Sequence, residues 1–127
     1  MAINFNQNST FNLKQISNDS VRNEVMGLLI NDEMIIYAFQ TIRDQLIFTN
    51  KRIISVDVQG ITGKRKSFTS MPYSRIQYFT IQTPGFMEAF PDSELFLMFS
   101  SGFTATFEFK DRVDIGVLGR LISQYIL

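Results

Sequence analysis

The sequence predicts a mostly β domain: a seven-stranded antiparallel barrel with an N-terminal helix and a C-terminal capping helix. Short β-patterned runs follow one another from Glu33 to Lys110 and are separated by turn residues. The last stretch, to Leu127, instead carries apolar residues at helical spacing. The length of 127 residues is enough to bury one core, so we expect one domain.

The chain begins with a polar stretch. Residues 1–17 are rich in Asn, Gln and Ser and carry only isolated apolar residues, so we interpret them as an N-terminal arm. Two positions for this arm stay open, against its own barrel or against a neighbouring chain. The single domain is then expected over residues 18–127.

A helix is predicted over Asn18–Ile30. Val21, Val25 and Leu28 fall on one face of such a helix. Asn18 or Asp19 would cap it, because a short polar side chain can accept a hydrogen bond from a free backbone N–H.

Seven runs with strand character follow. They are rich in β-branched and aromatic residues and are bounded by Gly, Pro, Asn and Ser. A glycine-bearing loop, Ser100–Gly102, joins the last two as a hairpin. The expected strands are Glu33–Gln40, Asp44–Thr49, Arg52–Val58, Lys64–Met71, Ile76–Gln82, Glu94–Phe99 and Phe103–Phe109.

Two of these strands are apolar on both faces. One extra row runs through Ile35, Tyr37 and Phe39, and the other through Phe96 and Met98. A strand with water on one side has no reason to carry a second apolar row. We therefore expect the N-terminal helix, another subunit or both to cover these rows.

The C-terminal helix is predicted over Asp111–Leu127, with Asp111 as its N-cap. Its apolar stripe has the three- and four-residue spacing of one helix face. The residues of the stripe are Val117, Leu118, Leu121, Ile122, Tyr125 and Ile126.

Composition argues against several classes of function. The 12 basic and 12 acidic residues balance, whereas a nucleic-acid binder needs a basic surplus. The chain has no Cys and no His, so it has no thiolate, no Ser-His-Asp triad and no usual zinc ligand. We expect no enzyme, no cofactor and no metal. The first residues carry no signal peptide pattern, so a cytoplasmic protein is expected.

Several segments resemble the bacterial pleckstrin-homology domain family. The resemblance spans roughly Leu28–Leu127 and implies a PH-like barrel, a bacterial source and ring-like homo-oligomers. The family has no established enzymatic activity, so it implies no catalytic residues. The segments that carry it are Arg43–Ile54, Val56–Arg65, Met71–Ile76 and Thr83–Gly85.

Eukaryotic lipid-binding relatives differ from this chain at the first hairpin. They place several cations there, whereas the turn Gln40–Asp44 offers only Arg43, next to an acidic residue. We therefore expect no selective binding of phosphoinositides by that route.

One basic concentration remains as a candidate contact for an anionic ligand. It comprises Lys64, Arg65 and Lys66, with Lys51 and Arg52 from a neighbouring turn. A solvated hairpin explains the same residues and is favoured, because alternate strand residues point to opposite faces. The preceding segment Gly60–Lys64 lacks the spacing and the following helix of a phosphate loop, so a hairpin is again the better interpretation.

Acidic residues gather in two places, Asp32–Glu33 and Asp92 with Glu94. Their spacing matches no calcium loop, and adjacent carboxylates at strand entries usually face water. We therefore expect neither a metal site nor an acid–base pair there.

The loop Gly85–Pro91 is unusually apolar, with Phe86, Met87 and Phe90. These side chains either fold back over the mouth of the barrel or form an exposed anchor for a partner. The surplus apolar strand faces favour the anchor.

These observations lead to a non-enzymatic, self-assembling interaction domain whose partner is itself, with another protein as the alternative partner. A peripheral binder of anionic lipid or another anionic ligand is the first alternative, and an unrecognised enzyme is the second. We expect weak or no lipid binding and no nucleic acid binding. The candidate residues of the oligomer interface are Ile35, Tyr37, Phe39, Phe86, Met87, Phe90, Phe96 and Met98.

Overall fold

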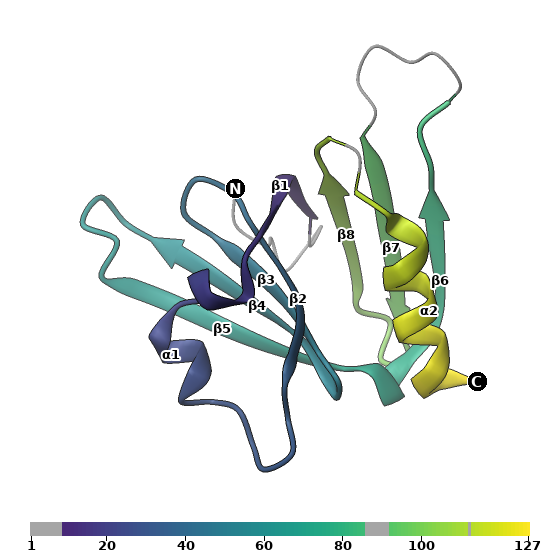
Figure 1. The fold of residues 1–127 in the computed structure, drawn as a ribbon, viewed down its shortest axis with the longest axis horizontal. Helices are drawn as coiled ribbons and strands as arrows, with labels where there is room; N and C mark the ends of the chain where they lie inside the picture. Colours follow the sequence, from purple (N-terminus) through teal and green to yellow (C-terminus); the bar gives the residue numbers. More distant parts are fainter. Residues whose placement is uncertain (1–8, 86–91, 112) are drawn as a thin grey trace.

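The computed structural model describes residues 9–85, 92–111 and 113–127, which form a bent β-sheet with a helix on each half (Figure 1). The sheet has eight strands in the order β5-β4-β3-β2-β1-β8-β7-β6. The strands are β1 (Ser9–Ile16), β2 (Ile35–Gln40), β3 (Gln45–Thr49), β4 (Arg52–Gln59), β5 (Arg65–Pro72), β6 (Ile76–Gln82), β7 (Ser93–Phe99) and β8 (Thr104–Phe109).

The predicted class, mostly β with a closing C-terminal helix, is confirmed. All seven predicted strands are present as β2 to β8, with bounds within two residues of those expected. Two details differ from the predicted seven-stranded barrel. The described residues contain an eighth strand, β1, and the sheet is open because its end strands β5 and β6 do not pair with each other.

Strand β1 lies in the centre of the sheet, within the segment interpreted as an arm. It pairs antiparallel with β2 and parallel with β8, and so joins the two halves. Its pattern escaped the sequence analysis because the pairing shifts between Thr10 and Leu13, where Asn12 takes a φ of 63°. The shift breaks the alternation of side chains. This part of the arm therefore packs in its own sheet.

The predicted helix Asn18–Ile30 is much shorter in the structure. Only a 3-10 turn, η1 (Asn18–Ser20), and one turn of α-helix, α1 (Asn23–Met26), form. Val21 and Val25 are buried as expected, but Leu28 is 44 % exposed. Gly27 ends α1, since glycine disfavours continuing a helix. The residue that caps the 3-10 turn is Ser17, which accepts from the Asp19 N–H.

The C-terminal helix is α2 (Ile115–Ile126), which begins later than predicted. Asp114 caps it by accepting a hydrogen bond from the Gly116 N–H at 3.1 Å. Asp111, the expected cap, instead takes a φ of 63° and turns the chain into the helix. Tyr125 stacks on Tyr73 with ring centroids 5.1 Å apart.

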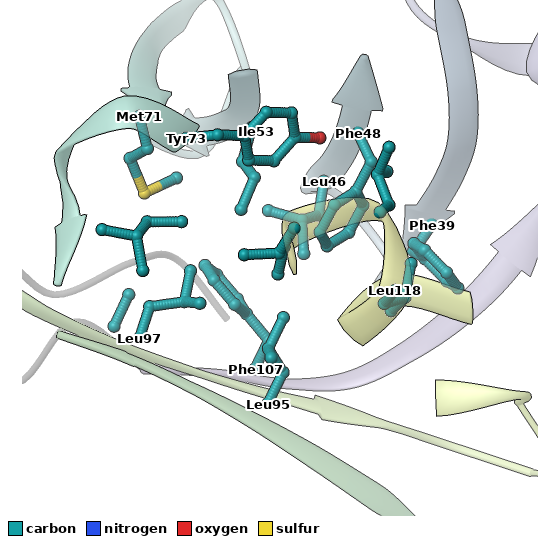
Figure 2. Packing of buried hydrophobic residues seen from close by; sticks show 14 of the residues in the cluster. Phe39, Leu46, Phe48, Ile53, Met71, Tyr73, Leu95, Leu97, Phe107 and Leu118 are labelled. Atoms are coloured by element: carbon teal, nitrogen blue, oxygen red, sulfur yellow. The ribbon is translucent and has the colours of Figure 1, made fainter. Parts of the chain in front are cut away.

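The main core lies between the two halves of the sheet and α2. Figure 2 shows side chains from β2, β3, β4 and β5 meeting Leu95, Leu97 and Phe107 of the other half, with Leu118 of α2 among them. Tyr73 closes one side, and its hydroxyl donates to the Thr49 carbonyl at 2.7 Å. Burial raises the pKa of Tyr73 above its usual value, so it stays a neutral donor.

A smaller cluster explains one of the two surplus apolar rows. Ile35 packs with Val25 and Ile54 beneath α1, whereas Tyr37 packs against the main core. Phe39 is 1 % exposed and belongs to the main core. A register shift between Ile35 and Tyr37 moves them apart. The row on β2 is therefore covered by the chain itself.

Candidate binding surface

The second apolar row lies on the face of β6, β7 and β8 that points away from the core. On β7, Leu95 and Leu97 are buried, while Phe96 and Met98 are only half-buried. Met98 lies opposite Tyr78 of β6, and Phe96 lies opposite Thr80. We call this surface the outer face; it consists of Tyr78, Thr80, Phe96, Met98, Thr104 and Thr106.

Neither described helix covers the outer face. The buried residues of α2, such as Leu118, pack with Leu95 and Leu97 on the opposite side of the sheet. Helix α1 packs on the other half of the sheet through Val25 (Figure 1). Tyr78 is 49 % exposed, and its ring lies 6.2 Å from that of Phe96. The outer face is therefore an aromatic patch bordered by threonines.

Tyr78 is the residue of this patch that the sequence analysis missed. It follows Ile76 by two positions, and strict alternation would turn both side chains into the core. A register shift between them reverses the pattern, so Ile76 is buried and Tyr78 faces out. Nothing in the local sequence marks this shift.

Acidic residues border the outer face where β7 begins and where β6 and β8 end. Glu94 lies directly opposite Glu108 on one side and Gln82 on the other. Directly opposed like charges destabilise a sheet. With Asp92 and Ser93 they line a cavity of about 110 Å³. In the described ranges no group of three or more His, Cys, Asp or Glu could hold a metal ion.

The other acidic candidate, Glu33, is fully engaged in an ion pair. Its side chain is 0 % exposed and accepts from Arg52 at 2.9 Å and from the Thr49 hydroxyl at 2.7 Å. Burial tends to raise the pKa of Glu33, but these hydrogen bonds outweigh burial, so the pKa lies below its ordinary value. Glu33 therefore has a structural role, while its neighbour Asp32 is exposed at a turn with a φ of 66°.

The structure separates the basic residues that the sequence placed together. Lys51 lies before β4 and Lys64 after it, roughly 25 Å apart along the strand. Arg52 binds Glu33, and Lys66 lies 3.2 Å from Glu24 of α1. Lys64 and Arg65 are exposed.

The tips of the β2–β3 and β4–β5 hairpins meet at the end of the half-sheet that carries Lys64. Arg43 of the β2–β3 turn donates to the Gly60 carbonyl in the β4–β5 turn. Gly60 and Gly63 have φ values of 78° and 67°, as a glycine hairpin requires. Each tip carries one fully exposed isoleucine, Ile42 or Ile61.

The apolar loop residues Phe86, Met87 and Phe90 lie outside the described residues. Their proposed part in an interface stays a prediction. In the described parts of the chain, no helix is both long and apolar enough to cross a membrane.

The chain is similar to two proteins of Bacillus subtilis strain 168. It is 42 % identical to the uncharacterized protein YjqA over 84 residues, which are 66 % of each chain. It is 31 % identical to the uncharacterized protein YozO over 111 residues, which are 87 % of this chain and 94 % of YozO. The match thus spans slightly less than two thirds of YjqA.

A solved structure supports the same grouping. A DUF1696 family protein with a pleckstrin-homology domain from Shewanella loihica PV-4 is 32 % identical and superposes with a TM-score of 0.77. The superposition covers 93 % of this chain and 100 % of that protein. The model of the bacterial PH domain matches residues 4–126. The chain therefore belongs to the bacterial PH domain family.

Proposed function

We propose that this chain is a non-enzymatic interaction domain that associates with copies of itself through the outer face of β6, β7 and β8. The observation that carries the proposal is the half-exposed row of Tyr78, Phe96 and Met98, which no described helix covers. Exposed contiguous apolar patches on a small domain usually mark an interface.

The chemistry of the outer face suits a protein partner. Aromatic and methionine side chains are enriched in the centres of interfaces, and polar residues form the rim. Here Tyr78, Phe96 and Met98 form the centre, and Thr80, Thr104 and Thr106 surround them. The whole chain has a net charge of zero, so copies do not repel one another strongly.

A variant pair tests this proposal. Met98→Lys places a charge in the centre of the outer face, and we expect it to lower the mass measured by light scattering without changing the circular dichroism spectrum. Phe68→Lys is the matched control, because Phe68 is 36 % exposed on β5, on the other half of the sheet. If both variants or neither change the mass, the outer face is not the interface.

A second candidate function, contact with an anionic membrane, is favoured by the hairpin tips. Ile42 and Ile61 are fully exposed beside Arg43, Lys64 and Arg65. An apolar side chain flanked by cations can insert between lipid head groups, and each cation near the surface contributes about 1 kcal/mol.

Sedimentation with phosphatidylcholine vesicles, with or without phosphatidylserine, tests the second candidate. Weak binding only to the phosphatidylserine vesicles, lost at high salt, is expected. Ile42→Asp should abolish it, while Ile30→Asp, at an exposed isoleucine of the α1–β2 connection, should not. If all variants sediment equally, or if none sediments, the hairpin tips do not form the membrane contact.

A further inference from the structure

The open edge of β5 presents unused backbone hydrogen-bonding groups. Arg52 lies opposite Pro72, and the Arg52 N–H and C=O both bond to the Thr49 hydroxyl, so they point away from β5. Because backbone groups alternate along a strand, Met71, Thr69 and Ser67 bond to β4. The backbone groups of Ser70, Phe68 and Lys66 then point outward.

No described segment pairs with this edge. β5 is the last strand of the sheet, and no backbone hydrogen bond outside the strands of the described ranges involves Lys66, Phe68 or Ser70. An edge lysine usually discourages pairing with another chain. Lys66 instead extends over the α1 side to Glu24, 3.2 Å away. The edge therefore remains open to an added strand.

A cavity of about 300 Å³ lies beside the C-terminal end of this edge. Met71, Phe99 and Phe103 give it apolar walls, and the rings of Phe99 and Phe103 lie 5.5 Å apart. Thr69 also lines it. Residues that pair directly across two strands point to the same face. A side chain from an added strand, placed next to Thr69 or Met71, would therefore enter the cavity.

Arg75 supplies a single positive charge at the same place. Its carbonyl accepts from the Ser100 N–H at 2.9 Å and from the Ser100 hydroxyl at 3.2 Å, which fixes its backbone to the β7–β8 turn. Its side chain is exposed, lines the cavity and has no ion-pair partner among the described residues. Among the described residues, no carboxylate lines the cavity. A cation beside an apolar cavity favours an acidic group in the ligand.

We propose that the β5 edge and the adjoining cavity bind an extended peptide segment of a partner protein. The segment adds a strand to β5, inserts one apolar side chain between Met71, Phe99 and Phe103, and directs an acidic side chain to Arg75. Backbone pairing supplies affinity, and the cavity and Arg75 supply selectivity. The residues of this edge and cavity are not among those of the outer face, so the proposal does not depend on self-association.

A displayed library of random short peptides, selected on the intact chain, supplies the probe. We expect enriched sequences in which an apolar residue and an acidic residue recur at fixed spacing. A synthetic peptide of the consensus is then titrated by fluorescence polarisation. Failure to enrich any peptide above the level obtained with Arg75→Glu would overturn the proposal.

Two variant pairs test the two halves of the site. Arg75→Glu should weaken the peptide about tenfold or more, while Arg120→Glu, the same charge change at an exposed position of α2, should not. Ser70→Pro removes an outward N–H and should abolish binding. Ser70→Ala, which loses only the hydroxyl bonded to Arg52, should bind normally.

Several outcomes would contradict the proposed site. Equal binding of the peptide to wild type, Arg75→Glu and Ser70→Pro would show that it binds elsewhere. If Ser70→Pro does not fold, judged by circular dichroism, the Arg75 pair decides alone. If no peptide is selected, but Ser70→Pro has a lower mass in solution than wild type, the edge pairs with a second copy and the peptide proposal is wrong.

Discussion

At the scale of single residues, polar contacts at the end of β3 join Tyr73, β4 and the segment before β2. Tyr73 donates to the Thr49 carbonyl, and the Thr49 hydroxyl contacts Glu33, which in turn binds Arg52. Bonded partners in this network are separated by up to 24 positions in the chain. No local pattern announces such a network, so the sequence predicted only an exposed acidic pair at Asp32–Glu33.

Replacing Tyr73 with Phe should lower the free energy of unfolding by roughly 1–2 kcal/mol, because the buried hydrogen bond to Thr49 is lost while the ring remains. Urea denaturation monitored by circular dichroism measures this change. Tyr78→Phe is the matched control, since Tyr78 is half-exposed on the outer face. An equal loss in both variants would show that the Tyr73 hydroxyl contributes nothing specific.

Replacing Glu33 with Gln should lower the free energy of unfolding by roughly 2–3 kcal/mol at neutral pH, because it breaks the ion pair with Arg52. The folded-state pKa of Glu33 lies below its ordinary value of 4.5. The stabilisation is therefore present above pH 4.5 and is lost as the pH falls through the folded-state pKa.

Urea denaturation of wild type and Glu33→Gln as a function of pH measures this dependence. The difference between the two curves should shrink below pH 4.5. Glu108→Gln, which relieves the repulsion with Glu94, should not destabilise the protein at any pH. A difference between wild type and Glu33→Gln that does not change with pH would contradict the role of the ionised carboxylate.

At the scale of elements, the sequence predicted those strands and helices that local composition and spacing determine. Strands β2 to β8 are rich in β-branched and aromatic residues bounded by turn residues, α2 carries a helical apolar stripe, and all were expected within a few residues. Two predictions for the N-terminal region were wrong, because the arm contains a strand and the helix is short. β1 lacks alternation because Asn12 interrupts it, and α1 is short because Gly27 and the exposed Leu28 do not continue the stripe.

Replacing Leu13 with Ala tests the central position of β1. Leu13 is 0 % exposed, and truncating a buried leucine costs about 2–5 kcal/mol. Phe11→Ala, at a neighbouring residue that is 38 % exposed, should cost far less. Chemical denaturation of both variants checks this. Equal stability of Leu13→Ala and wild type would contradict the packing of β1 in the core and favour a loose arm.

At the scale of the whole molecule, the strand order could not be predicted from the sequence. The pairing of Thr10 with Phe107 joins the two ends of the chain and leaves no local signal. The surplus of apolar rows did predict that some surface needs a cover. The structure divides that surplus: α1 and the main core cover the β2 row, while Phe96 and Met98 remain at the surface with Tyr78.

The central claim is that a second copy covers the outer face, and the mass of the wild-type chain in solution tests it most directly. Multi-angle light scattering over a range of concentrations should give a multiple of 14.6 kDa. The same multiple should persist at high salt, because apolar contacts are not screened. A mass of 14.6 kDa at the highest concentration reached would contradict the claim.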